Sequence, residues 1–389
     1  NTNIIDPLLR QNLEARGYDE TLIRRAIQRF IKEASLPAGG SLYEVNRKVY
    51  GLLRYGVKVQ RSASETFETV WLIDWANPNA NHFAVAEEVT VKGHYTKRPD
   101  LVVYVNGIAL GVIELKRSKV SVSEVIRQNI GNQKSDFIRS FFTTVQLLFA
   151  GNDVEGLRYG VIDTPEKYWL QWKEGSDAQE PLNRGVLQIL DKDRFLEIIH
   201  DFIVFDAGVK KTCRHNQYFG IRAAQERIQK REGGIIRHTQ GSGKSLTMVW
   251  LAKWIRENQE NSRVLIITDR TELDEQITDV FAGVDESITR ATSGENLLEL
   301  LNKSQPWLMC SLVHKFRGDN ESASNDETFE FLRELKKSKA QGFEPKGNLF
   351  VFVDEAHRTQ SGKLHAAMKK LLPDAMFIGF TGTPLLKKD

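Results

Sequence analysis

The feature that most constrains this chain is a glycine-rich stretch of eight residues, His238 to Ser245 (HTQGSGKS). It follows a short apolar run, Gly234 to Ile236, and precedes a segment of helical character, Leu246 to Glu257. A strand, a tight loop and a helix in this order form a phosphate-binding loop, because backbone N–H groups and the helix N-terminus then face one anion. We therefore expect an α/β fold built around this loop.

Each residue type in the loop has a predicted task. Gly241 and Gly243 allow the backbone to turn tightly, Lys244 offers a positive charge to the β- and γ-phosphates, and Ser245 is expected to bind Mg²⁺. The alternative is a glycine and serine turn with a chance lysine, since His238 stands where the strict pattern has a glycine. The predicted nucleotide contacts in the loop are Thr239, Gly241, Ser242, Gly243, Lys244 and Ser245.

Two later segments are expected to meet this loop at one edge of a sheet. The apolar run Leu349 to Val353 predicts a buried strand that ends in Asp354 and Glu355, and Ala375 to Phe380 predicts another that ends in a Thr-Gly-Thr-Pro turn. Asp354 is the expected Mg²⁺ ligand, and Glu355 is expected to polarise the water that attacks the γ-phosphate. Taken singly, each segment could also be an ordinary acidic or glycine-containing turn.

A second group of charged residues lies in the first half of the chain. The segment 97–105 predicts a strand, Asn106-Gly107 predicts a tight hairpin turn, and 108–115 predicts the returning strand. Glu114 and Lys116 are two residues apart and share a face of the strand, while Asp100 comes from its neighbour. Asp100 and Glu114 are candidate Mg²⁺ ligands, and Lys116 is a candidate for orienting the attacking water.

Composition sets the domain count and the environment. A chain of 389 residues with 41% hydrophobic residues can bury two cores, and the polar segment near residue 180 divides it into 1–190 and 191–389, with 206–208 as an alternative boundary. Cys213 and Cys310 are far apart, which predicts free thiols in a cytoplasmic protein. No apolar run is long enough to predict a membrane partner.

The first eighty residues carry weaker patterns. Residues 4–33 have the spacing of two amphipathic helices, and residues 43–73 predict strands or a hairpin. The net charge of +3 is too small for a uniformly basic surface, so a nucleic-acid contact would have to be local.

The loop 238–245, the Asp354-Glu355-Ala356-His357 box and the turn 381–384 resemble the motifs of the first RecA-like domain of superfamily 2 helicases and translocases. The resemblance implies a parallel-sheet domain that binds ATP and Mg²⁺, with His357 at the nucleotide site. Phe219, Arg222 and Gln225 are similar to the element that reads adenine, which makes Gln225 a further candidate contact. A motor of this superfamily needs a second such lobe, which this chain lacks, so we expect half an ATP site and weak hydrolysis.

Pro99-Asp100 followed by Glu114-Leu115-Lys116 resembles the PD-(D/E)xK nucleases. The resemblance implies a mixed sheet with flanking helices and Mg²⁺-dependent cleavage of DNA. Residues 122–140 have helical spacing, and Gln128 is similar to the glutamine of the Q-x-x-x-Y element of one nuclease subgroup. Asn132 stands where that element has a tyrosine, which leaves the role of the element open.

A nuclease followed by a motor resembles the restriction (R) subunit of type I restriction-modification enzymes. The resemblance implies a type I site-specific deoxyribonuclease that translocates duplex DNA with ATP and cuts unmodified DNA with Mg²⁺. Its implied partners are double-stranded DNA and the methylation and specificity subunits. Two alternatives stay open, a helicase-nuclease of DNA repair or another defence system, and a DNA-binding scaffold with a degenerate nuclease fold.

Overall fold

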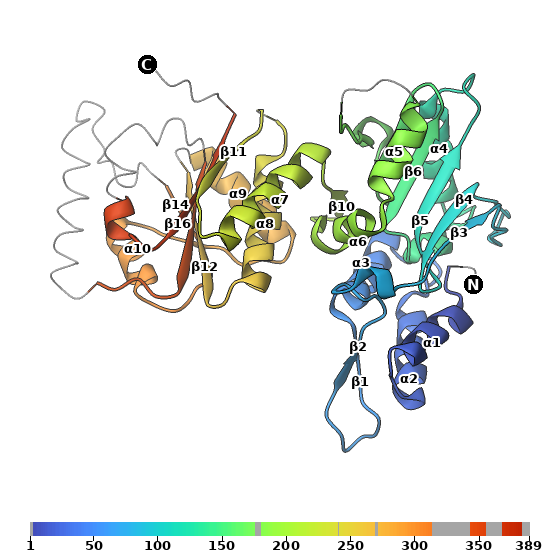
Figure 1. The fold of residues 1–389 in the computed structure, drawn as a ribbon, viewed down its shortest axis with the longest axis horizontal. Helices are drawn as coiled ribbons and strands as arrows, with labels where there is room; N and C mark the ends of the chain where they lie inside the picture. The colour runs from blue at the N-terminus through green and yellow to red at the C-terminus, as the bar shows by residue number, and fades with distance from the viewer. Residues whose placement is uncertain are drawn as a thin grey trace. The chain divides into compact units, whose positions relative to one another are not determined.

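The computed structural model describes residues 3–175, 180–239, 241–268, 271–312, 343–354 and 368–382. The chain forms two compact units, Asn1–His215 and Asn216–Asp389 (Figure 1). The first unit runs past residue 190 because α6 (Lys192–Asp201) and the hairpin of β9 (Ile203–Asp206) and β10 (Val209–Thr212) pack on its core. The backbone carbonyl of His200, for example, accepts a hydrogen bond from Arg54 Nε at 2.6 Å.

The N-terminal part of the first unit is mostly helical. The two predicted helices are confirmed as α1 (Asp6–Ala15) and α2 (Glu20–Glu33). The prediction of strands from residue 43 is wrong up to residue 55, because α3 (Leu42–Tyr55) occupies that segment. The Ser41 hydroxyl caps α3 by accepting from the Glu44 N–H at 3.3 Å. The predicted hairpin follows as β1 (Val57–Val59) and β2 (Glu68–Val70).

A six-stranded mixed sheet forms the centre of the first unit, in the order β3-β4-β5-β6-β7-β8. Neighbouring strands are antiparallel except β5 and β6, which are parallel. Asn106 and Gly107 join β4 to β5 with φ angles of 51° and 77°, as the predicted hairpin turn requires. The strands are β3 (Phe83–Glu87), β4 (Leu101–Val105), β5 (Ile108–Leu115), β6 (Leu147–Asn152), β7 (Gly156–Gly160) and β8 (Leu170–Gln171).

Alternation along the strands gives this sheet two buried faces. Val102, Val112 and Leu148 pack with the apolar side of α4 (Val122–Asn132) on one face. The opposite face is covered by α5 (Pro181–Ile189) and α6, and the Phe195 ring of α6 lies so close to Gly111 that a Cβ there would be 3.4 Å from it. The mixed sheet with flanking helices was predicted.

Helix α4 is shorter than predicted. The helical spacing extends to residue 140, but α4 ends at Asn132 and a short 3₁₀ turn, η2 (Arg139–Thr143), follows. Lys134, Ser135 and Asp136 are exposed, whereas Ile138 is fully buried. The Ile138 N–H donates to the Asn132 carbonyl at 3.2 Å and the Phe137 N–H to the Lys134 carbonyl at 3.0 Å, so the helical i→i−4 pattern is not continued after Asn132.

The second unit contains a six-stranded sheet in the order β11-β16-β15-β12-β14-β13, and every neighbouring pair is parallel. The predicted strands around the phosphate-binding loop and the two later segments are confirmed as β11, β15 and β16. The strands are β11 (Gly234–Arg237), β12 (Ser262–Thr268), β13 (Thr289–Arg290), β14 (Leu308–Leu312), β15 (Asn348–Asp354) and β16 (Met376–Thr381).

Helices cover both faces of this sheet (Figure 1). Helix α10 (Gly294–Leu301) packs with Leu265, Val351 and Val353 in one core, on the side opposite α8 (Lys244–Asn258). The remaining helices are α7 (His215–Gln229) and α9 (Thr271–Gly283). Cys213 and Cys310 form no disulfide with described residues, as predicted, and both are buried. None of the described helices is long and apolar enough to span a bilayer.

Candidate nuclease and nucleotide sites

The hairpin of β4 and β5 brings Asp100 and Glu114 together. Leu101 pairs with Ile113 in the register of the two antiparallel strands, so the residues one step beyond this pair are Asp100 and Glu114. The Asp100 Oδ2 atom accepts a hydrogen bond from the Leu115 N–H at 2.7 Å. The structure therefore places the two predicted carboxylates beside each other at the open end of the hairpin.

Lys116 joins this pair. Its Nζ atom lies 3.6 Å from Asp100 Oδ2, and both side chains are about one-third exposed, at 34% and 36%. Side chains two residues apart on a strand lie on the same face, so Asp100 shares a face with Val102, and Glu114 and Lys116 share it with Val112. This is the sheet face that α4 covers. The arrangement agrees with the predicted convergence of two carboxylates and one ammonium group.

The carboxyl group of Glu114 is fully buried. Burial raises the pKa of Glu114 from its ordinary 4.5 to about 8; the negative charge of Asp100 adds to the shift and the positive charge of Lys116 opposes it. The side chain thus binds a proton near neutral pH unless a cation replaces that proton. A buried carboxylate next to one that is about one-third exposed is a good fit for a divalent cation, whose charge would offset both the cost of burial and the repulsion between the carboxylates.

Two amides on α4 hold Glu114 in place. Gln128 Nε2 donates to Glu114 Oε2 at 2.9 Å, and Asn132 Nδ2 donates to Glu114 Oε1 at 3.0 Å. Gln128 and Asn132 are four residues apart, so they lie on one stripe of the helix. The contact of Gln128 with the site was implied by its resemblance to the nuclease element, and Asn132 acts beside it where that element has a tyrosine.

The carboxylate pair would bind Mg²⁺ with few protein ligands. In the described ranges no group of three or more His, Cys, Asp and Glu side chains is placed to hold a metal ion. Mg²⁺ commonly keeps several waters and is often held by one or two carboxylates together with substrate phosphates. The residues present therefore fit Mg²⁺ bound by Asp100 and Glu114, with its other positions left to water and DNA.

The phosphate-binding loop has the predicted backbone geometry. Gly241 and Gly243 have φ angles of 76° and 87°, a region that side chains disfavour. Gly243 is the N-cap residue of α8 and has no side chain to accept from the first N–H groups of the helix. Lys244 and Ser245 begin α8 directly after it. N–H groups at a helix start that has no side-chain cap, next to a lysine and a serine, suit a phosphate.

The strand ends around this loop meet at one edge of the sheet. β16 lies between β11 and β15, and Asp354 pairs with Phe380 while Arg237 pairs with Thr381. The His238 N–H donates to the Thr381 carbonyl at 2.9 Å, which ties the loop to the end of β16. Asp354 is buried at the carboxyl end of β15. Glu355 and His357 lie outside the described residues.

Two glutamines of α7, Gln225 and Gln217, differ in their hydrogen bonds, and only Gln217 contacts the phosphate-binding loop in the described residues. Gln225 is buried, and among the described residues its Nε2 atom has no hydrogen-bond partner. Gln217, which the sequence did not single out, donates to the Gly243 carbonyl at 2.9 Å. Thr239 accepts from the Ser242 N–H at 3.2 Å through its backbone carbonyl, and the buried Ser242 hydroxyl has no partner in the described part of the chain.

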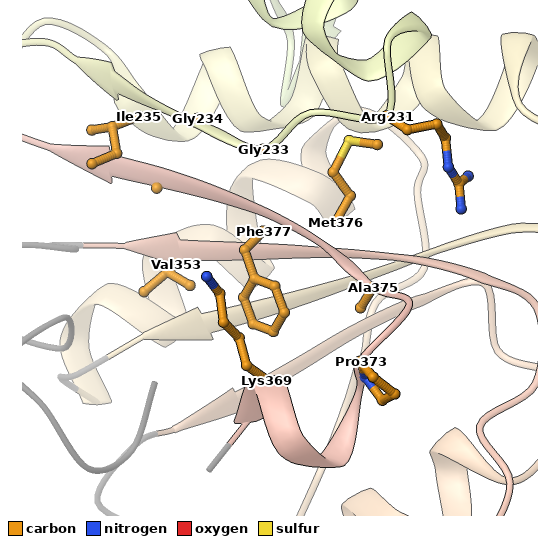
Figure 2. A pocket seen from close by; sticks show the side chains of 11 residues that line it. Arg231, Gly233, Gly234, Ile235, Val353, Lys369, Pro373, Ala375, Met376 and Phe377 are labelled. Atoms are coloured by element: carbon orange, nitrogen blue, oxygen red, sulfur yellow. The ribbon is translucent and has the colours of Figure 1, made fainter. Parts of the chain in front are cut away.

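A cavity of about 640 Å³ borders the same sheet but lies elsewhere. Most of its lining comes from the beginnings of β11 and β16, with Phe377, Val353 and Lys369 around it (Figure 2). The phosphate-binding loop is at the opposite, carboxyl ends of these strands. None of the described residues that are predicted to bind nucleotide lines the cavity, so we do not assign the nucleotide to it.

Two family models match the chain, each to one of its units. Residues 1–167 match the N terminus of the type I restriction enzyme R protein, and residues 216–389 match the SWI2/SNF2 ATPase. The chain is 30% identical over 380 residues to the MjaIXP endonuclease subunit of Methanocaldococcus jannaschii, covering 87% of this chain and 35% of the relative. It is 26% identical over 421 residues to the type I restriction enzyme HindI endonuclease subunit of Haemophilus influenzae, covering 96% of this chain and 38% of the relative.

The chain is thus similar to the R proteins of type I restriction enzymes over most of its length. It spans little more than a third of the length of these two relatives. Among solved structures, the Sulfolobus solfataricus SWI2/SNF2 ATPase core in complex with dsDNA gives a TM-score of 0.35 at 15% identity, over 49% of this chain and 35% of that chain. The R-protein and ATPase matches fall on the two units that carry the carboxylate pair and the phosphate-binding loop.

Two residues that contact predicted site residues, Asn132 and Gln217, were not themselves predicted as site residues. Asn132 could have been found from its spacing, because it follows Gln128 by four residues on a helix that faces the carboxylates. Gln217 left no comparable signal, since its contact with Gly243 depends on how α7 packs against the loop. Arg263 of β12 is buried and donates to the carbonyls of Leu300, Leu301, Pro306 and Lys346.

Proposed function

We propose that this chain carries the DNA-cleaving unit and the first ATP-binding lobe of a type I restriction R subunit. The whole protein would translocate duplex DNA with ATP and cut unmodified DNA with Mg²⁺, in complex with methylation and specificity subunits. The observation that carries the proposal is the pairing of Asp100 with the fully buried Glu114, beside Lys116. A scaffold with a degenerate nuclease fold would not need to keep a carboxylate buried at such an energetic cost.

The residues of the first unit would have separate roles in phosphodiester hydrolysis. Asp100 and Glu114 would hold Mg²⁺, which supplies Lewis-acid polarisation of the phosphate and of an attacking water. Lys116 keeps a positive charge within 3.6 Å of Asp100, where it can orient that water and neutralise charge that develops on the phosphate. Gln128 and Asn132 fix the direction of the Glu114 carboxylate through their two hydrogen bonds.

The second unit would bind ATP at the carboxyl edge of its sheet. The N–H groups at the start of α8 and the Lys244 ammonium group would hold the phosphates, and Ser245 with Asp354 would hold Mg²⁺. Glu355 and His357 are proposed to act on the attacking water, and Gln225 is proposed to read adenine. We therefore expect this chain to bind ATP together with Mg²⁺ at this edge of the sheet.

The nuclease assignment is tested by a nicking assay on supercoiled DNA with Mg²⁺ or Mn²⁺. Lys116→Ala should lose most of the cutting, whereas Lys48→Ala, an exposed lysine on α3, should cut like the parent. Cutting that survives Lys116→Ala would remove Lys116 from the mechanism. A parent chain that neither binds Mn²⁺ nor cuts would favour the scaffold alternative.

The nucleotide assignment is tested by calorimetry with ATP and Mg²⁺. Lys244→Ala should abolish detectable binding, because the phosphates lose their counter-charge in the loop. Lys230→Ala, an exposed lysine after α7, is the matched control and should bind like the parent. Equal binding by the parent and Lys244→Ala would refute the phosphate-binding role of this loop.

A further inference from the structure

A small surface loop comes just before the Asp100 strand. Val91 and Lys97 exchange two backbone hydrogen bonds, of 2.9 Å and 3.0 Å, and so close the five residues 92–96 into a loop. All five are exposed, and Tyr95 is 58% exposed. We call residues 91–98 the basic loop. It presents polar and aromatic side chains to solvent within a few residues of a catalytic carboxylate.

The basic loop is held against the turn that follows α4. The Tyr95 N–H donates to the Asp136 carbonyl at 3.0 Å, and the Lys97 ammonium group lies 4.5 Å from the centre of the Phe137 ring. Gly93 lies so close to this turn that a Cβ on it would be 2.1 Å from the Phe137 carbonyl oxygen. Contacts of this kind fix the position of the loop before any partner arrives.

Positive charge is concentrated in the chain segments just before Asp100 and just after Glu114. Between Glu88 and Asp100 the sequence has three cations, Lys92, Lys97 and Arg98, and no acidic residue. Between Glu114 and Glu124 it has three more and again no acidic residue. We call residues 116–119 the second basic segment; its cations are Lys116, Arg117 and Lys119.

Part of this charge is available to a partner. Arg98 lies 3.8 Å from Glu88, Lys97 contacts Phe137 and Lys116 pairs with Asp100. Lys92, Arg117 and Lys119 are exposed, and none of the three forms an ion pair within the described residues. The two segments together contain six cations, whereas the whole chain has a net charge of only +3, so positive charge is concentrated locally in them.

We propose that the basic loop and the second basic segment form a clamp for the sugar-phosphate backbone of duplex DNA on either side of the bond that is cut. The proposal rests on the proposed nuclease function and adds to it the surface that holds the substrate. Lys92 lies ahead of Asp100 in the chain, and Arg117 and Lys119 follow Glu114, so the two halves of the clamp flank the hairpin of β4 and β5 in the sequence.

The chemistry of the surface fits phosphates better than bases. Lysine and arginine side chains bind phosphate oxygens without reading sequence, and they release counterions when they do so. Three of the clamp cations, Lys92, Arg117 and Lys119, have exposed side chains that can adjust to the positions of phosphates along a DNA backbone. Direct readout of bases would instead need a helix or ribbon shaped to enter a groove, with side chains held in fixed directions. We therefore expect binding without sequence preference.

The test uses the whole chain and a short fluorescent duplex, with Ca²⁺ in place of Mg²⁺ to limit cutting, over a range of KCl concentrations. The triple variant Lys92→Gln, Arg117→Gln, Lys119→Gln should lower the slope of log affinity against log salt by about 3, since each phosphate contact contributes about one unit. Its affinity should fall by at least tenfold at low salt and equally for duplexes of unrelated sequence, while Mn²⁺ binding stays at the parent value.

Two matched variants make the result specific. Arg24→Gln, Lys32→Gln, Lys58→Gln removes three exposed cations from α2 and β1 and should keep the parent slope. Lys92→Arg, Arg117→Lys, Lys119→Arg keeps the charge and should bind DNA like the parent. An unchanged slope in the Gln triple variant, or an equal loss in the α2 and β1 variant, would overturn the clamp.

The same experiment separates the clamp from the proposed nuclease function. If the parent binds DNA and cuts it but the Gln triple variant is indistinguishable from it, the clamp fails and the nuclease assignment stands. If the parent neither binds DNA nor cuts it, the nuclease assignment fails and the clamp with it. In a cutting assay the Gln triple variant should raise KM with little change in kcat, because the carboxylates are untouched.

Discussion

Asn132 Nδ2 donates a hydrogen bond of 3.0 Å to Glu114 Oε1, so a helix holds the carboxylate that a strand delivers. Both residues are buried, and α4 packs through Val125 and Ile126 on the same face of the sheet. The direction of the Glu114 side chain is therefore fixed by the core of the first unit as well as by its own strand. Substitutions on α4 should therefore change the position of the Glu114 carboxylate, and with it the proposed metal site, without removing a ligand of the metal or a contact with DNA.

Replacing Glu114 should make the metal-free protein more stable at alkaline pH. The pKa of Glu114 is raised from 4.5 to about 8, so the folded state keeps a proton that the unfolded chain loses between these values. Stability therefore falls as pH rises from 4.5 to 8, whereas Glu114→Gln avoids this loss. We expect thermal unfolding in EDTA to show Glu114→Gln more stable by a few kcal/mol at about pH 8.5 and much less so at about pH 5.

The exposed Glu87 supplies the control for this comparison. Glu87→Gln should unfold with the pH dependence of the parent. Parallel pH profiles for Glu114→Gln and the parent would mean that Glu114 is ionised in the metal-free protein throughout this range.

Metal binding should release a proton. Near pH 7 the carboxyl group of Glu114 is mostly protonated, because its pKa is about 8, and a divalent cation needs the ionised form. Calorimetry with Mn²⁺ in two buffers of different ionisation enthalpy should give a release of about one proton near pH 7 and less above pH 8. The apparent affinity should rise about tenfold per pH unit between pH 6 and pH 8 and then level off. Binding enthalpies that do not depend on the buffer would contradict this.

Removal of the Asn132 amide should weaken the metal site more than removal of the Gln128 amide. Asn132 is 5% exposed, whereas Gln128 is exposed and water can replace its hydrogen bond. Asn132→Ala leaves one oxygen of a buried carboxylate without its donor and should cost about 1–3 kcal/mol of unfolding free energy. It should also raise the pKa of Glu114 further, since the lost hydrogen bond stabilises the ionised form. Urea unfolding and Mn²⁺ titration of both variants measure this order, and equal losses would argue against a holding role for Asn132.

The two loop glycines should differ in their tolerance of alanine. A Cβ at Gly243 would lie 2.6 Å from Gln217 Nε2, whereas a Cβ at Gly241 meets no described atom within 4 Å. Both glycines have positive φ, so each alanine bears backbone strain of about 1 kcal/mol. Gly243→Ala should lose ATP affinity beyond the loss in Gly241→Ala, as measured by calorimetry. Adding Gln217→Ala to Gly243→Ala should restore part of the difference, and no restoration would mean that the clash is not the cause.

The arrangement of Asp100, Glu114 and Lys116 was predictable in part. The two-residue period of a strand puts Glu114 and Lys116 on one face. The Asn106-Gly107 turn pairs Val105 with Ile108, and that register alone would place Asp100 opposite Ile113. An irregularity between Val103 and Tyr104 shifts the register by one residue and so pairs Asp100 with Glu114, and no sequence pattern indicated it. The meeting of β11, β15 and β16 at one edge was predictable, since parallel strands end at the same side of a sheet.

Other features depend on contacts between distant segments. Residues 42–55 alternate in part like a strand, but they form α3, whose Asn46 amide donates to the carbonyls of Phe142, Thr143 and Val145 almost a hundred residues away. The contact of Gln217 with Gly243 likewise follows from the packing of α7. Local propensity is a weak guide where such long-range packing decides the conformation.

β11, which leads into the phosphate-binding loop, is at the edge of the described sheet, and each of its paired residues in β16 comes 144 residues later in the chain. During synthesis on the ribosome, the backbone of β11 stays unpaired with β16 until residues 376–381 have emerged. A nascent chain released before that point would expose the apolar Ile235 and Ile236 on an open strand, which is a template for aggregation. The proposed nucleotide-binding edge is thus completed only after residues 376–381 have been translated.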